Sequence, residues 1–305
     1  MKRIIILVLT ASAMTSAVQA CDVCGCSSSN QFLGVLPQYH KNFIGLQYQY
    51  NSFKGDHPSL FENKPDEHSE DYYRTLQLWG RYNIGKRIQL FGFVPYRFNR
   101  QITDGTESRK EGLGDVSVLV NYLLLKDKAT GEWQHQLLAG GGLKLPTGAY
   151  TGITAQDKLG IPNMQPGTGS WDFIANVNYT VRQEKLGFNA DASYTMTTVN
   201  SEKYKYGNRL NAGLLGFYTL QHKQVTFLPQ VGFRYEYALH DYDDYSRKWL
   251  NEQSGGYLSF ATAGVQSYYK QWGLRITCQL PVAQHYSNGY VTAGYKLDAG
   301  LLFLF

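Results

Sequence analysis

The sequence lacks any apolar run long enough to cross a bilayer as a helix. Its most concentrated apolar stretch runs from Ile4 to Leu9, whereas a transmembrane helix needs about 20 such residues. The formal charge of +5 falls to +3 if Lys2 and Arg3 leave with a leader, an excess too small to favour a nucleic-acid partner. Proline is also scarce, with 9 residues in 305, and there are only 4 methionines and 4 cysteines. Transmembrane helices and nucleic-acid binding are therefore not expected.

Aromatic residues and glycine are abundant instead. Aromatics make up 14% of the chain, with 24 tyrosines, and there are 31 glycines, yet the mean hydropathy is −0.36. Many aromatics in a polar chain suit a membrane β-barrel, whose strands give only alternate residues to lipid and carry aromatic girdles at both interfaces. On composition alone, a soluble β-sandwich remains the alternative.

The first 20 residues are typical of an export signal. Basic Lys2 and Arg3 precede the short apolar run, and small residues lead to Val18-Gln19-Ala20 before Cys21. We therefore expect three parts: a signal peptide over 1–20, a cysteine-rich periplasmic segment over 21–42, and a single domain over 43–305.

Residues along this domain alternate between apolar and polar with the period of a β-strand. In the last segment Tyr295, Leu297, Ala299 and Leu301 share one parity, and the chain ends in the aromatic Phe305. The predicted strands are 43–53, 73–83, 87–99, 113–125, 133–145, 171–182, 185–198, 206–220, 224–238, 256–269, 271–283 and 292–305. The sequence thus predicts an all-β fold, a closed antiparallel transmembrane β-barrel of about 12 strands, in the outer membrane of a Gram-negative bacterium.

The predicted connections alternate between short and long. Long links are expected at 54–72, 100–112, 146–170, 199–205, 239–255 and 284–291, with short turns between them. Short turns on the periplasmic side and long loops outside are the asymmetry of outer-membrane barrels. An even strand number would then leave both termini in the periplasm.

The parity that sends apolar residues outward sends charged residues inward, into the lumen. The predicted lumen residues are Arg81, Asp115, Lys144, Asp172, Asp191, Arg209, Arg234, Glu236 and Arg275, together with Arg182, Lys296 and Asp298. One interpretation is a wall of paired charges that fills a narrow barrel, because isolated buried charges are costly. The other is a polar path for a small solute or ion.

Three cysteines form the sharpest local motif. Cys21, Cys24 and Cys26 could bind a soft metal such as copper or zinc, because thiolates are soft donors. In an oxidising periplasm they could instead form one disulfide with a cysteine left over, or Cys21 could carry a lipid. The apolar residues that follow make the 21–42 segment a candidate plug for the barrel, the alternative being a flexible tail. No cofactor is firmly indicated.

Two further patterns allow other roles. Acidic clusters over 56–71 and at Asp241, Asp243 and Asp244 could hold divalent bridges to lipopolysaccharide, although a solvated surface is the simpler interpretation. His285-Tyr286-Ser287-Asn288-Gly289 is similar to a string in outer-membrane phospholipase A. In an extended segment, His285 and Ser287 would point the same way, as a base and nucleophile must, but no clear third partner follows.

Several strings, in order along 45–305, resemble one family of outer-membrane barrels. They are Val94-Pro95-Tyr96, Gly112-Leu113-Gly114-Asp115, the run from Gly142 to Gly148, and Leu280-Pro281-Val282 with Gln284 and Asn288-Gly289. The family is named after the meta-pathway of phenol degradation, and its members are described as transporter-like. The resemblance implies an outer-membrane barrel through which small organic solutes pass. Independently of it, we expect no enzyme activity. The alternatives are a non-transporting barrel that presents a periplasmic thiol site and, less favoured, a lipid hydrolase. The oligomeric state stays open.

Overall fold

The structure, a computed structural model, describes residues 41–57, 67–126, 133–150, 162–251 and 253–305. Within these ranges, no helix is both long and apolar enough to span a membrane. The two short 3-10 helices are η1 (Pro162–Met164) and η2 (Ser287–Gly289).

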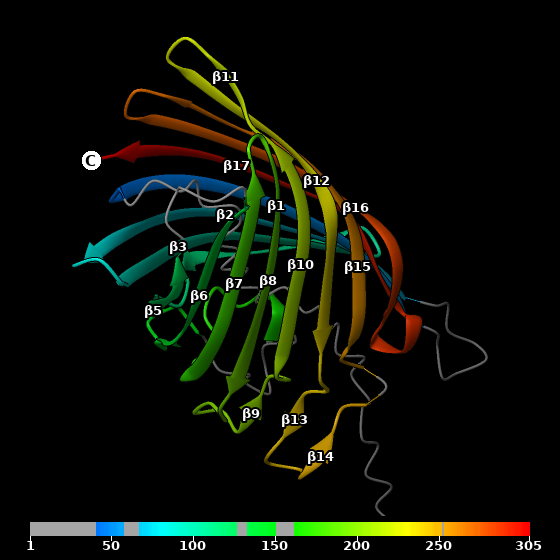
Figure 1. The fold of residues 1–305 in the computed structure, drawn as a ribbon. Helices are drawn as coiled ribbons and strands as arrows, with labels where there is room; N and C mark the ends of the chain where they lie inside the picture. The colour runs from blue at the N-terminus through cyan, green and yellow to red at the C-terminus, as the bar shows by residue number, and fades with distance from the viewer. Residues whose placement is uncertain (1–40, 58–66, 127–132, 151–161, 252) are drawn as a thin grey trace, which may run out of the picture.

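Twelve principal strands form one closed antiparallel barrel (Figure 1). They are β1 (Phe43–His57), β2 (Glu67–Ile84), β3 (Ile88–Thr103), β5 (Ser117–Lys126), β6 (Trp133–Lys144), β7 (Asp172–Gln183), β8 (Leu186–Thr197), β10 (Arg209–Tyr218), β12 (Val225–Ala238), β15 (Gly256–Tyr269), β16 (Trp272–Tyr286) and β17 (Val291–Leu304). The last strand pairs with the first, from Phe43 opposite Leu304 to Gly55 opposite Val291, and closes the sheet. The predicted all-β barrel of 12 strands is confirmed.

Alternation in the sequence becomes alternation between the two faces of the wall. On β17, Leu302 and Leu304 are buried, whereas Leu301 is 49% exposed and Phe305, just after the strand, is 58% exposed. On β3, Phe91 and Phe93 are buried while Val94 and Tyr96 are exposed. An apolar outer face and a filled interior follow from the two-residue period of each strand.

The predicted long link at 100–112 is wrong, because it forms a β-hairpin. Strand β3 continues to Thr103, and β4 (Thr106–Leu113) returns along it with Thr103 opposite Thr106. Asp104 and Gly105 make the turn with φ of 47° and 81°, the positive values that a two-residue hairpin turn requires. As a result β5 begins at Ser117 instead of at 113.

The two ends of the barrel differ. At the turn end lie the short links after β2, β7 and β15, the small strand β11 (Leu220–His222) and the last residue. At the opposite loop end, β9 (Tyr204–Lys205), β13 (Tyr242–Asp243) and β14 (Lys248–Trp249) form a separate three-stranded outer sheet. Figure 1 shows this outer sheet and β11 at opposite ends of the molecule.

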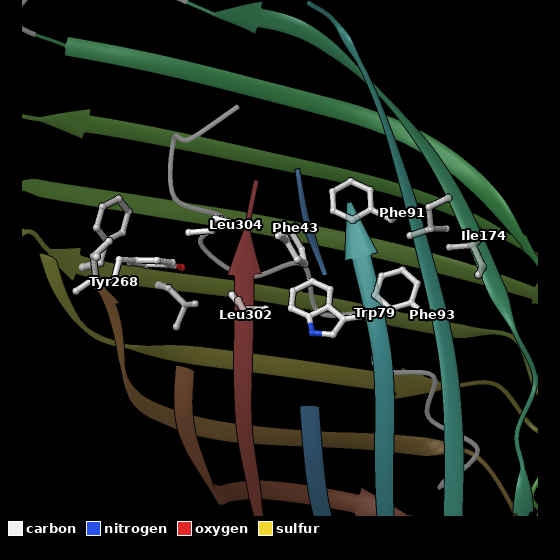
Figure 2. Close-up of a cluster of buried hydrophobic side chains, with 12 residues drawn as sticks. Phe43, Trp79, Phe91, Phe93, Ile174, Tyr268, Leu302 and Leu304 are labelled. Carbon is white, nitrogen blue, oxygen red and sulfur yellow. The ribbon is translucent and has the colours of Figure 1, made fainter. Parts of the chain in front are cut away.

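Two apolar clusters fill the interior. The turn-end cluster contains inward-facing Phe43, Trp79, Phe91, Phe93, Leu119, Ile174, Leu215, Phe217, Leu228, Tyr268, Leu302 and Leu304, and Figure 2 shows part of it. The loop-end cluster contains Phe53, Tyr73, Met164, Ala238, Leu258, Phe260, Tyr286, Val291 and Ala293. Side chains from many strands meet in each cluster, so both help to hold the wall around its interior.

Candidate functional site

A belt of buried polar side chains lines the inside of the barrel alongside the two apolar clusters. Its uncharged members are mostly amides, and all are buried: Gln47, Gln49, Gln77, Asn121, Asn178, Asn189, Gln230, Gln266, Thr277 and Gln279. They come from strands all around the barrel. In a soluble domain such a density of buried amides would be costly, so the belt is the feature of the interior that most needs a functional explanation.

The nine charged residues predicted for the lumen all lie on this inward side or at its loop end. Those with at most 5% of their surface exposed are Arg81, Asp115, Lys144, Asp172, Arg234 and Arg275, and Asp191, Arg209 and Glu236 are half-buried. The structure separates eight of them into three groups with different partners, and Arg209 lies apart from these, near the outer sheet. Whether any of them contacts a solute stays a prediction.

The first group is a buried cluster where β5, β6 and β7 reach the loop end. Lys144 Nζ lies 2.6 Å from Asp172 Oδ2 and 3.2 Å from Asp115 Oδ2. Asp115 also accepts hydrogen bonds from the backbone N–H groups of Gly148 and Thr168, at 3.0 and 2.9 Å, and from the Thr168 hydroxyl at 2.6 Å. Ser170 Oγ donates to Asp172 at 2.9 Å. These charges therefore fasten a connecting segment to the wall.

That segment, residues 162–170, returns into the barrel, although the sequence suggested a loop outside it. Asn99 Nδ2 donates to the Met164 carbonyl at 3.0 Å, and Tyr206 OH donates to the Pro162 carbonyl at 2.9 Å. Met164 packs in the loop-end cluster with side chains from β1, β2 and β15. The segment thus reaches across the interior, and no periodic pattern in its sequence indicates this placement.

The second group lies deeper in the belt as ion pairs. Arg234 Nη1 lies 3.5 Å from Asp191 Oδ2, and Lys296 Nζ donates to both oxygens of Glu236, at 2.7 and 2.8 Å. Gln47 donates to Asp298 Oδ1 at 2.9 Å. Pairing of this kind offsets the cost of taking charges out of water. The belt therefore carries both signs of charge in close alternation.

The third group is two arginines at the turn end, which lie against aromatic rings. The guanidinium carbon of Arg275 is 5.2 Å from the Trp79 ring centre, and that of Arg81 is 5.2 Å from the Phe43 ring centre. Arg81 also donates to the Lys41 carbonyl at 2.7 Å. Trp79 and Phe43 are in van der Waals contact within the cluster of Figure 2. These two cations are therefore stabilised by ring faces, and Arg81 also by a backbone carbonyl.

Arg209 lies near the outer sheet, beside a carboxylate that the sequence suggested to be solvated. Asp241 is only 3% exposed. It accepts hydrogen bonds from Tyr204 OH at 2.5 Å and from the Gly207 backbone N–H at 2.6 Å. Burial raises the pKa of Asp241, and these two donors and the charge of Arg209 oppose the rise. Asp241 therefore holds the loops together, which the acidic composition of its segment does not indicate.

The remaining predicted sites are the cysteine cluster, the candidate plug and the string that contains His285 and Ser287. Cys21, Cys24, Cys26 and most of the candidate plug lie outside the described residues. Among the residues that are described, no group of three His, Cys, Asp or Glu side chains is placed to hold a metal ion. The expected extended geometry of His285 and Ser287 is wrong: Ser287 begins the η2 turn with a φ of 47° and is buried, whereas His285 is exposed.

Comparison with known proteins supports the fold. The chain is similar to an outer-membrane channel from Pseudomonas putida F1, with a TM-score of 0.64 and 14% identity over 89% of this chain and 100% of that one. It is also similar to the β domain of the Bordetella autotransporter BrkA, with a TM-score of 0.46 and 10% identity over 87% of this chain and 100% of that one. No family model matches the sequence, and no curated protein matches it. The fold is therefore that of outer-membrane β-barrels, and the phenol-pathway resemblance stays a prediction.

Proposed function

We propose that this protein is an outer-membrane channel for small solutes or ions, with its short turns and both termini on the periplasmic side. The observation that carries the proposal is the continuous inward belt of amides and paired charges, enclosed by a wall whose outer face is apolar. A belt of this kind suits a polar path, because amides and alternating charges can replace the hydration of a passing solute. The likeness of fold to the P. putida channel supports the same reading.

In this proposal the in-folded segment 162–170 narrows the loop end, and the aromatic cluster narrows the turn end. Selectivity comes from the belt, where Arg234, Asp191, Lys296 and Glu236 set the local field. Lys144, Asp115 and Asp172 act on the path indirectly, because they hold the segment in place.

Planar-bilayer recording of the full mature chain tests the proposal. We expect discrete conductance steps from the wild type. Asp298→Asn removes one negative charge from the belt beside Gln47, so the reversal potential in a salt gradient should shift towards anion preference. Glu184→Gln removes the same charge from an exposed turn and should leave the potential unchanged. The proposal would be overturned if the wild type gave no conductance, or if both variants shifted the reversal potential equally.

A second candidate is a closed barrel that transports nothing and presents a thiol site in the periplasm. The two clusters of buried apolar side chains inside the barrel favour it. It predicts silent bilayers together with one copper or zinc ion bound per chain through Cys21, Cys24 and Cys26. Metal analysis of protein purified from membranes under reducing conditions, beside a variant with all three cysteines replaced by serine, separates the two candidates.

A further inference from the structure

Among the described residues, a group of charged side chains lies on the outward face of the wall in the sector of β1 to β4. At the loop end of β1 to β4, the outward positions hold Lys54, Arg74, Arg100 and Arg109, together with Glu70, Glu107 and Glu111. Near the loop ends of other strands, the outward positions hold the exposed apolar residues Val118 on β5, Phe173 on β7 and Leu210 on β10. The sector therefore differs from the apolar wall beside it.

Arg74 is the innermost of these charges. Below it on β2, the outward residues Leu76, Leu78, Tyr82 and Ile84 are all exposed and apolar or aromatic. Arg74 lies ten residues before Ile84. In a strand tilted by about 40°, ten residues rise about 25 Å, which is about the height of the apolar band of an outer-membrane barrel. Arg74 thus sits at the outer boundary of that band.

Neighbouring side chains give Arg74 an aromatic setting. Across the sheet it lies opposite Tyr50 on β1 and Phe98 on β3. Tyr50 packs against Tyr295 with ring centres 5.2 Å apart. The Arg100 guanidinium carbon lies 5.7 Å from the Tyr72 ring centre. Aromatic rings of this kind occupy the boundary between acyl chains and head groups.

The carboxylates of the sector are mostly engaged with other cations. Glu107 is bound by Arg100 Nε at 2.8 Å and by Arg109. Glu70 accepts from Tyr72 OH at 2.7 Å and lies 3.7 Å from Lys54 Nζ. Glu111 lies opposite Phe98, so that a whole strand separates it from Arg74. Among the described residues, Arg74 has no carboxylate within ion-pair distance.

An exposed arginine at this boundary lies at the depth of the lipid head groups, whose phosphates can pair with it. We propose that Arg74 anchors a phosphate of an outer-leaflet glycolipid, that is, a lipid A head group, whose acyl chains lie along Leu76 and Leu78. A guanidinium binds phosphate with two parallel hydrogen bonds. Arg100 and Arg109, which share one carboxylate, add positive charge just above it. The inference rests on the proposed membrane location but not on channel activity.

Native mass spectrometry of the detergent-solubilised mature chain tests the site. The probes are diphosphoryl lipid A and fully dephosphorylated lipid A. The wild type should bind the phosphorylated form. Arg74→Gln should lower the affinity for this form at least about tenfold, since a charge-assisted bond of this kind is worth roughly one decade or more in affinity. Arg74→Lys should restore part of the binding. Dephosphorylated lipid should bind weakly to every variant.

The matched control is Arg87→Gln. Arg87 is exposed near the turn end and donates to Tyr122 OH at 3.1 Å, so it also combines an arginine with a tyrosine on the outside of the wall. The Arg87→Gln variant should bind lipid A as the wild type does. Equal losses in both glutamine variants, or equal binding of the two lipids, would overturn the site. Conductance measured on the same preparations shows separately whether the proposed channel function stands.

Discussion

At the scale of single residues, Asp241 shows how a buried charge can organise a loop region. Asp241→Ala would leave Tyr204 OH and the Gly207 N–H without their acceptor. An unsatisfied buried group costs about 1–3 kcal/mol, so the outer sheet of β9, β13 and β14 should open more often. Hydrogen exchange of the amides in 204–207 and 241–249 measures this. Asp244→Ala removes only a surface ion pair to Lys203 at 3.7 Å and should change little. Equal protection in the two variants would contradict this role of Asp241.

The same carboxylate predicts a pH dependence with a definite sign. Burial places the pKa of Asp241 above its ordinary value, so the folded outer sheet binds a proton more tightly than the open one does. Its stabilising contribution is therefore full at pH below the ordinary aspartate value and is lost as pH rises through the raised pKa. Exchange rates in 241–249, corrected for the chemical rate, should rise over that interval. Asp241→Asn, which cannot titrate, should abolish the dependence, and a persisting dependence would point to another group.

At the scale of elements, close approach between β5 and β6 is a requirement that propensity does not reveal. A Cβ atom on Gly142 would lie 2.0 Å from the Val118 carbonyl oxygen and 2.6 Å from Leu119 Cδ2. Gly142→Val should therefore destabilise the barrel by about 1–3 kcal/mol, the usual cost of overpacking, although valine favours strands. The measurement is the midpoint of the heat-induced shift on unboiled SDS gels. Gly92→Val provides the control, because a Cβ there meets nothing within 4 Å; equal midpoints would contradict the steric argument.

The strands themselves could be predicted because their two faces meet different surroundings. Segments such as 171–182 and 185–198 alternate clearly, and β7 and β8 match them within a residue. Strand β4 was missed because Glu107, Arg109 and Glu111 make its outward face polar. Where the hairpin leaves the apolar band, the contrast between its faces disappears. The inward charges followed from the same parity, but their partners did not.

At the scale of the whole molecule, what the sequence could not predict is how distant segments meet inside the barrel. Met164 belongs to the same buried cluster as Phe53 and Phe260, which are more than 90 residues away on either side. Such contacts depend on closure of the wall and on the path of a segment without periodicity. Asp115 was predicted as a lumen residue, yet its hydrogen bonds with Gly148 and Thr168 give it a local structural role. The alternation of the sequence predicted the position of Asp115 in the lumen, whereas its structural role could be recognised only in the folded structure.

The in-folded segment gives the whole-molecule prediction. Asp115→Ala removes the acceptor of two backbone N–H groups and of the Thr168 hydroxyl, and it removes one of the two carboxylates at Lys144. With this fastening gone, segment 162–170 should leave the interior for part of the time. Under the proposed channel function, the loop end then widens, and bilayer recordings should show larger and noisier conductance steps than the wild type.

Asp191→Ala is the matched comparison for this prediction. It also removes a buried inward carboxylate, one that lies 3.5 Å from Arg234, but its partners are on the wall and not in the segment. It should change ion preference while the step size stays near that of the wild type. If both variants enlarge the step alike, loss of any inward charge is enough and the segment does not set the width. If neither does, the narrowest part lies at the turn end, where Trp79, Phe91 and Phe93 meet.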